Sequence, residues 1–142
     1  MKRRIEHFAA LAFACIASFA FADARTDYML NCMGCHRVDG AGTEPDVPAL
    51  AERVGYYLQV PGGRDYLVQV PGAANAPLTD DALAGVINWI IEAFGGTSTP
   101  ARFEPFSADE VAKARSTRPL DIMKDRGALA EQIRARFPQA GW

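Results

Sequence analysis

The pentapeptide Cys32-Met33-Gly34-Cys35-His36 decides how this chain folds. Two thiols separated by two residues, with a histidine directly after the second, form the C-x-x-C-H pattern of covalent haem attachment. On one helical turn both thiols can reach the two vinyl groups along one edge of a porphyrin. A histidine held below the ring can bind the iron through Nε2 while its other nitrogen seeks a carbonyl that fixes the ring orientation. The pattern therefore predicts one covalent haem c on Cys32 and Cys35, with His36 as the iron ligand.

Three other kinds of site could use the same residues. A structural zinc site needs four Cys or His ligands, but the chain after residue 22 offers only His36 and the two cysteines. A thioredoxin-like redox pair would start a helix after a buried strand, and no apolar β-rich run precedes Cys32. An exported protein could also hold a structural disulfide between Cys32 and Cys35. A disulfide gives His36 no role, so haem attachment is the interpretation that uses all three side chains.

The first 22 residues have the pattern of a secretory signal peptide. A basic start, Met1 to Arg4, precedes an almost wholly apolar run from Phe8 to Phe21, and small residues stand at Ala20 and Ala22. The apolar run falls short of the roughly 20 residues that span a bilayer. We therefore expect cleavage after Ala22, export to the periplasm and no permanent membrane anchor.

The chain that remains is acidic in its body and mildly basic in its tail. Loss of the signal removes three basic residues and one acidic residue, which changes the net formal charge from −2 to −4. Residues 23–99 hold four basic and ten acidic side chains, whereas residues 100–142 hold eight and six. Neither part has the clustered Lys and Arg with interleaved aromatics that bind a phosphate backbone. The composition therefore gives nucleic-acid binding no support.

Motifs on both sides of the pentapeptide resemble class I cytochromes c. That family runs from a helix with an aromatic residue, through C-x-x-C-H and a D-G-x-G-like loop, to a P-x-L-like segment and a last helix with an aromatic. The corresponding features here are Tyr28, Cys32 to His36, Asp39 to Gly42, Pro48 to Leu50, and Trp89. The match covers about residues 24–94 and implies an all-α, class I cytochrome c-like helical fold around one covalent haem. It also implies that the Pro48 carbonyl accepts a hydrogen bond from His36 Nδ1.

Apolar periodicity predicts a helix at each end of this region. We expect a short helix over about 24–34 and a longer one over 79–94, in which apolar side chains recur at helical spacing. Thr79 is the expected N-cap of the longer helix, and Gly95-Gly96 should end it. Trp89 is expected to pack against the first helix, as the resemblance implies.

The region between these helices contains Pro61-Gly62 and Pro71-Gly72, ten residues apart. Proline fixes φ and glycine accepts a positive φ, so these pairs predict two apolar loops that end in tight turns. We expect the loops to wall the haem face opposite His36. The nearby tyrosines should serve packing rather than chemistry.

The composition divides the chain into a signal peptide (1–22), a haem domain (23–96) and a linker with a C-terminal helical extension (97–142). Ser107 and Glu110 have the spacing of a capping box that opens a helix ending near residue 116. A second helix is expected over 120–137, interrupted near Gly127. Phe103, Phe106 and Trp142 indicate that the extension packs on something, and its own haem domain is the favoured surface.

These features favour an electron carrier over an enzyme. Outer-sphere electron transfer needs only an exposed haem edge and a rigid site, and no acid, base or nucleophile gathers near the motif, so we expect no catalytic residue. The expected role is that of a periplasmic mono-haem cytochrome that takes electrons from an exported dehydrogenase and passes them to an oxidase or another cytochrome. Two alternatives stay open: a five-coordinate haem protein with gas-binding or peroxidase-like activity, and a cytochrome subunit bound tightly to a dehydrogenase complex.

The pattern leaves the sixth iron ligand open. Class I cytochromes usually supply a methionine from the segment before the last helix, but residues 51–77 contain no Met, His, Cys or Lys. Met123 in the extension is a candidate ligand, with a core contact as its competing role. Asn75, or no protein ligand at all, is the remaining alternative.

Overall fold

The computed structural model describes residues 23–43 and 45–141, which form helices joined by loops. Apart from one antiparallel bridge between Thr43 and Val47, these residues contain no β-structure, which confirms the predicted all-α class. Within the same residues, no helix has the length and apolar composition needed to cross a membrane. The signal-peptide prediction for residues 1–22 and the prediction for Trp142 lie outside the described residues.

The predicted helix over 24–34 is split at Cys32. A helix over 23–31 is followed by α2 (Met33–His36), because Cys32 takes a φ of −125°, outside the helical range. Backbone hydrogen bonds from Cys32 N to the Tyr28 oxygen, 2.8 Å, and from His36 N to the Cys32 oxygen, 3.0 Å, keep the two pieces nearly continuous.

The prediction of apolar loops between the two main helices is wrong. This region forms α3 (Val54–Tyr57), α4 (Gly63–Gln69) and α5 (Pro71–Ala74). Pro61-Gly62 does make a turn, with Gly62 at φ +81° before α4. Pro71 instead starts a helix, because its fixed φ suits the first helical residue and the amide hydrogen that it lacks has no partner there.

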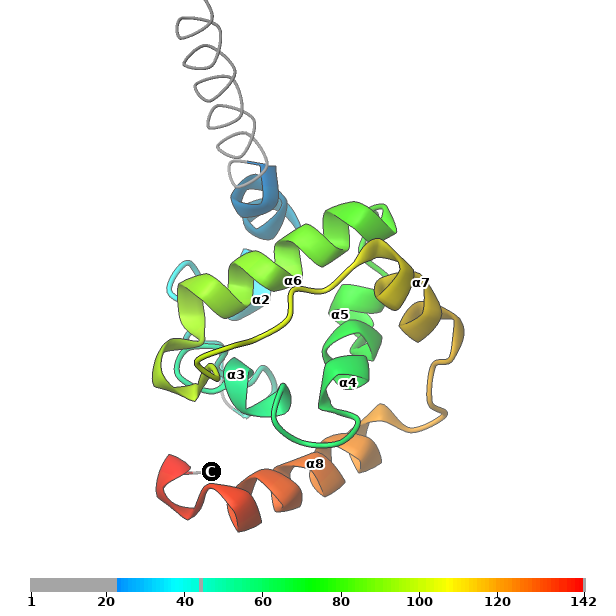
Figure 1. Cartoon of the computed structure of the whole chain (residues 1–142). Helices are drawn as coiled ribbons and strands as arrows, with labels where there is room; N and C mark the ends of the chain where they lie inside the picture. The colour runs from blue at the N-terminus through cyan, green and yellow to red at the C-terminus, as the bar shows by residue number, and fades with distance from the viewer. Residues whose placement is uncertain (1–22, 44, 142) are drawn as a thin grey trace, which may run out of the picture.

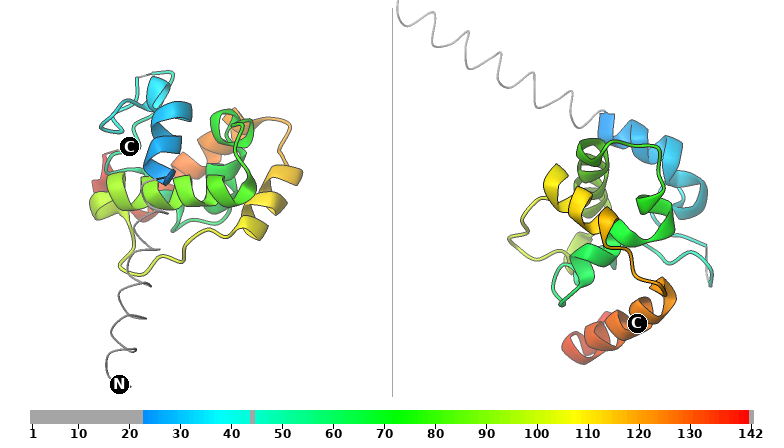
Figure 2. Two further views of the ribbon diagram at one scale, coloured as in Figure 1. Left: turned by 90° about the horizontal axis from the view of Figure 1, so that it is seen from above. Right: turned by 90° about the vertical axis from the view of Figure 1, so that its right-hand side faces the viewer.

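Helix α6 (Asp80–Phe94) matches its prediction. The Thr79 hydroxyl accepts a hydrogen bond from Ala82 N, and Gly95 follows the last turn. The buried side chains repeat at helical spacing: Leu83, Ala84, Val86, Ile87 and Ile91. Figure 2 shows the helix over 23–31 crossing α6. The pentapeptide, which follows this first helix, is therefore placed close to α6.

The C-terminal extension folds back along the body. After η1 (Gly96–Ser98) the chain runs extended to α7 (Ala108–Ser116), then to α8 (Ile122–Arg136) and η2 (Pro138–Ala140). The Ser107 hydroxyl caps α7 by accepting from Glu110 N, as the predicted capping box requires, but the Glu110 carboxylate pairs with Arg64 instead of completing the box. The predicted interruption near Gly127 is wrong: α8 runs through this exposed glycine, whose cost of about 1 kcal/mol in a helix is offset by the burial of Leu129 and Ile133.

The extension contributes to both apolar clusters of the body. The larger cluster joins buried residues of α3, α4 and α6 to Phe106, Val111 and Ala114. The smaller joins Tyr57, Val60 and Tyr66 to Leu129 and Ile133 of α8. In Figure 1, α7 lies beside α6 and α4, and α8 runs below α3 and α4. The residues after 96 therefore pack on the helices before them.

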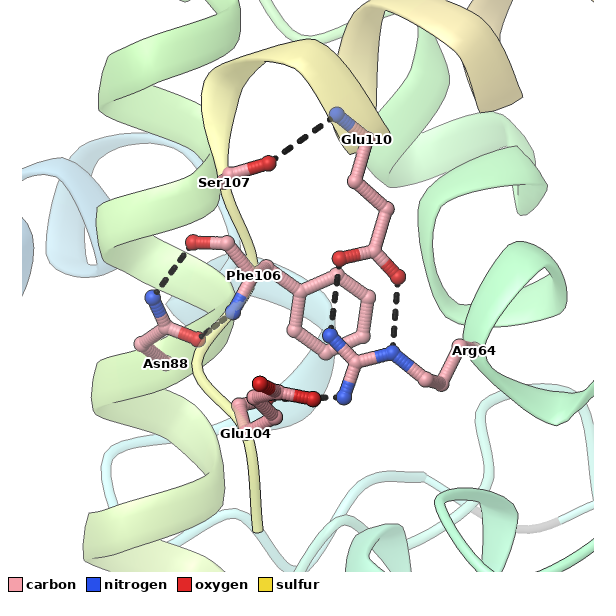
Figure 3. A network of polar contacts seen from close by, with 6 residues as sticks. All are labelled: Arg64, Asn88, Glu104, Phe106, Ser107 and Glu110. Atoms are coloured by element: carbon pink, nitrogen blue, oxygen red, sulfur yellow. Dashed lines mark hydrogen bonds and ion pairs between the residues drawn. The ribbon is translucent and has the colours of Figure 1, made fainter.

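A polar network holds the start of the extension (Figure 3). The Asn88 side chain both donates to and accepts from the backbone of Phe106, at 3.0 and 2.7 Å. Arg64 makes a two-pronged ion pair with Glu110, donates to the Glu104 carbonyl and places its guanidinium 3.9 Å from the centre of the Phe106 ring. Two-pronged arginine–carboxylate pairs fix direction as well as distance, so this network sets where α7 begins.

Candidate functional site

The two cysteines of the pentapeptide lie on one turn. Cys32 is the residue before α2 and Cys35 lies within it, with Cys35 N donating to the Cys32 oxygen at 3.2 Å. Both thiols are free; Cys32 is half-buried and Cys35 exposed. No residue of α2 is buried. Both sulfur atoms are therefore accessible to a planar group such as a porphyrin that binds beside this turn.

The environment of Cys32 does not suit a redox disulfide. Burial, together with the negative charges of Asp27 and Cys35, raises the pKa of Cys32 to about 11. A thioredoxin-like nucleophile needs a lowered pKa, because the thiolate is the attacking form. Cys32 stays protonated at neutral pH, which disfavours the redox-pair alternative.

His36 has one ring nitrogen that is already turned inward. Nδ1 is buried and makes no hydrogen bond of ordinary distance and angle within the described residues. The Pro48 carbonyl nevertheless lies near enough to act on it as an acceptor: burial lowers the pKa of His36, and the Pro48 carbonyl opposes this effect. The imidazole is therefore neutral at pH 7, which is the form that binds a metal ion through the other nitrogen. The resemblance implied the Pro48 carbonyl as the acceptor for Nδ1, and this role stays a prediction.

A glycine lets the Pro48 segment approach His36. Gly42 N donates to the His36 oxygen at 3.1 Å, and the reciprocal hydrogen bonds between Thr43 and Val47, both 2.8 Å, fold the chain back. Gly42 has φ +71°, and a Cβ there would overlap the Val47 carbonyl oxygen and lie 2.7 Å from that of Pro48. Only glycine fits this conformation and this approach without strain.

An aromatic cluster packs against the loop that follows His36. The Tyr28 ring lies 5.0 Å from Trp89 and 5.3 Å from Phe94, centre to centre, which confirms the prediction that Trp89 packs against the first helix. Gly40, at φ +70°, lies so close to Phe94 that a Cβ would be 2.9 Å from the ring. Its carbonyl accepts from Leu50 N at 2.7 Å. The loop after His36 is thereby fixed to the crossing of the two main helices.

Two arginines of the extension hold the segment before α6. Arg118 donates to Asn75 Oδ1 at 2.6 Å and to the Ala74 carbonyl at 2.7 Å. Arg115 donates to the Leu78 carbonyl at 2.9 Å and pairs with Asp80 at 2.8 Å. The oxygen of Asn75 is thus already engaged, and this disfavours Asn75 as an iron ligand.

Met123 lies near the start of α8 and is 64% exposed. The competing role given to it, a core contact, is therefore wrong. Its role as a sixth ligand stays a prediction.

The buried tyrosines form part of the packing, as predicted. Tyr57 and Tyr66 stack at 5.0 Å between ring centres, and both belong to the smaller cluster under α8. Burial raises the pKa of Tyr66, and the positive charge of Arg126 partly opposes this. Neither hydroxyl titrates near neutral pH.

Sequence reasoning missed three residues around the site. Arg115 and Arg118 carry no motif, because their acceptors lie about forty residues earlier in the chain. Tyr28 was recognised as an aromatic, but its hydroxyl also donates to the Arg37 carbonyl at 2.5 Å. No local pattern signals a hydrogen bond that depends on the return of the chain after α2.

The helical fold presents two free thiols and a neutral histidine on one turn, and this arrangement fits a covalently attached haem. Covalent haem attachment of this kind defines the c-type cytochromes as a class. The family model described as Cytochrome c matches residues 21–93. The chain is 32% identical over 140 residues to a cytochrome c-552 of Thermus thermophilus, covering 84% of this chain and 95% of that protein. It is 32% identical over 119 residues to another Thermus thermophilus cytochrome c-552, covering 70% and 91%. No solved structure matches the chain.

The chain belongs to the cytochrome c family. It is an electron carrier rather than an enzyme, it binds one haem c covalently, and it exchanges electrons with redox partner proteins. The fold class, the cofactor and the class of function predicted from the sequence are confirmed.

Proposed function

We propose that this chain is a periplasmic electron carrier that accepts electrons from an exported dehydrogenase and delivers them to an oxidase or another cytochrome. In this proposal the signal peptide is cleaved after Ala22, residues 23–96 form the haem domain, and residues 97–142 are a linker and helical extension. No permanent membrane anchor and no nucleic acid are involved.

The proposed haem contacts follow from the pentapeptide. Cys32 and Cys35 form the two thioethers, His36 Nε2 binds the iron, and the Pro48 carbonyl orients the imidazole from Nδ1. The observation that carries this assignment is the buried His36 Nδ1 facing Pro48, because metal-bound histidines almost always donate their other ring hydrogen to such an acceptor.

The residues around His36 support electron transfer by keeping the site rigid. When bound, the haem supplies a one-electron iron couple. The Gly40 and Gly42 loop and the aromatic cluster hold His36 against movement when the iron charge changes.

Haem attachment is tested by substituting the cysteines in a host that matures c-type cytochromes. Cys32→Ser combined with Cys35→Ser should abolish the holoprotein, whereas Cys15→Ser, in the proposed signal, should leave its yield unchanged. Acid-acetone treatment of the wild-type protein should leave the haem on the polypeptide. Extraction of the haem by this treatment would overturn the proposed attachment. Intact mass then reports whether the mature chain begins at Asp23.

A second candidate is a haem protein whose sixth iron position binds a small gas. It is favoured by the engagement of Asn75 with Arg118 and by the lack of a strong iron donor in residues 51–77. The Soret band of the reduced protein under carbon monoxide separates the candidates: no shift favours the carrier. If Met123 is the ligand, Met123→Ala should remove the weak near-infrared band of the oxidised protein and allow carbon monoxide to bind.

A further inference from the structure

The residue after His36 adopts a backbone conformation that side chains rarely take. Arg37 has φ 64° and ψ 169°, a region populated almost only by glycine, in which another residue costs about 1–3 kcal/mol. Such a conformation persists only where the surroundings hold it. Because Arg37 ends α2 directly after His36, whatever holds Arg37 also sets the backbone that carries the imidazole.

The Tyr28 hydroxyl forms a hydrogen bond with this strained residue. It donates to the Arg37 carbonyl at 2.5 Å, while Arg37 N donates to the Met33 oxygen at 2.8 Å. His36 itself is fixed by Cys32 on one side and by Gly42 N on the other. Three elements therefore meet at one residue: the helix over 23–31, α2 and the loop after it.

The side chain of Tyr28, which donates this hydrogen bond to Arg37, is held firmly in place. Only 1% of its surface is exposed, and its ring is packed against Trp89 and Phe94 of α6. Burial, together with the charges of Cys32 and Asp39, raises the pKa of Tyr28 to about 12. The hydroxyl therefore remains a donor through the whole neutral range.

We propose that Tyr28 is a positioning residue for His36: its buried hydroxyl holds the strained Arg37 backbone and thereby aims the imidazole at the iron. This inference rests on the proposed role of His36 as iron ligand. It assigns the aromatic of the first helix a polar task toward the site, in addition to its packing.

The test compares Tyr28→Phe with Tyr66→Phe in the full-length holoprotein. Both variants keep a buried ring and remove one hydroxyl, and the Tyr66 hydroxyl interacts with Tyr57 in the other cluster. Mutating outer partners of metal-bound histidines typically changes metal affinity by about 10- to 100-fold. We expect Tyr28→Phe to change the equilibrium constant for reduction by about tenfold, or about 59 mV for one electron. It should also shift the paramagnetic NMR resonances of the His36 ring, whereas Tyr66→Phe should change neither.

A second background tests the route through Arg37. Glycine adopts φ 64° without strain, so in the Arg37→Gly background the hydroxyl has less to hold and Tyr28→Phe should shift the equilibrium by less than half as much. The glycine background also removes the strain in the folded state, which helps keep the variant folded if Tyr28→Phe alone is too unstable. Equal shifts in both backgrounds, or a loss of stability with the potential and His36 resonances unchanged, would overturn the positioning role.

Failure of this inference is distinguishable from failure of the proposed haem ligation. If His36 does not bind the iron, the wild-type protein itself lacks iron-shifted His36 resonances. If only the positioning role is wrong, those resonances are present in the wild type and do not respond to Tyr28→Phe.

Discussion

Single residues around His36 are constrained more by backbone geometry than by side-chain chemistry. Gly42 has to be glycine because its φ is +71° and because the Pro48 carbonyl passes where a Cβ would stand. Gly34, in the same motif, has open space around it. The chain therefore offers two glycines within one site that should respond differently to the same substitution.

Gly42→Ala should destabilise the protein by about 2 kcal/mol or more, since the left-handed conformation alone costs an L-residue about 1–2 kcal/mol and the overlap with Val47 adds to it. It should also change the reduction potential, because Pro48 has to move away from His36. Gly34→Ala, in a helical turn with nothing near its Cβ, is the control: it should not lower the stability and should leave the reduction potential nearly unchanged. Thermal unfolding and a redox titration measure the two effects. Equal behaviour of the two variants would contradict the proposed approach of Pro48.

At the scale of elements, the short helix η1 is held by a carboxylate from a distant part of the chain. Glu52 Oε2 accepts from both the backbone nitrogen and the hydroxyl of Thr97, each at 2.8 Å. These hydrogen bonds lower the pKa of Glu52 below its ordinary value of 4.5. A carboxylate whose pKa is lower in the folded than in the unfolded protein adds stability above the unfolded pKa, and this stability is lost as the pH falls through the folded pKa.

The free energy of unfolding of Glu52→Gln should therefore fall below that of the wild type at neutral pH. The difference should stay constant down to about pH 4.5 and shrink as the pH falls further, because the wild-type carboxylate becomes protonated. Urea unfolding at a series of pH values measures it. A difference that does not change with pH would contradict a role for the charge.

The continuity of α8 gives a stabilising prediction. Gly127 lies inside the helix, is exposed, and has nothing near the site of a Cβ. Gly127→Ala should raise the free energy of unfolding by about 1 kcal/mol, the difference in helix propensity between the two residues. Gly72→Ala, at the start of the short helix α5 and equally open, is the comparison and should gain less. A loss of stability in Gly127→Ala would mean that α8 does bend there, as the sequence alone had predicted.

The whole molecule shows which features a sequence can and cannot predict. Helix α6 was predicted with its Thr79 cap because its periodicity and cap are local. The pentapeptide likewise predicted covalent haem and a c-type cytochrome, because the spacing of its cysteines and histidine is the spacing that haem attachment requires. The helices α4 and α5 were missed because a Pro-Gly pair suits both a turn and a helix start, and packing decides between them. The hydrogen bond from Tyr28 to Arg37 depends on tertiary geometry, which no local pattern contains.

The C-terminal segment with α7 and α8 shares both apolar clusters with α3, α4 and α6, so we expect the two parts to unfold together. Ile133 of α8 is fully buried at 0% exposure, whereas Leu120, just before α8, is completely exposed. Ile133→Ala should lower the free energy of unfolding by about 2–5 kcal/mol, and Leu120→Ala, which also truncates one aliphatic side chain of the extension, should change it little. The measurement follows thermal unfolding by helix content and by tyrosine environment, since Tyr57 and Tyr66 report from the body beneath α8. One transition, lowered equally in both signals, is the expected result. Two transitions, of which Ile133→Ala lowers only the first, would mean that α8 unfolds by itself and leaves the helices before residue 96 folded.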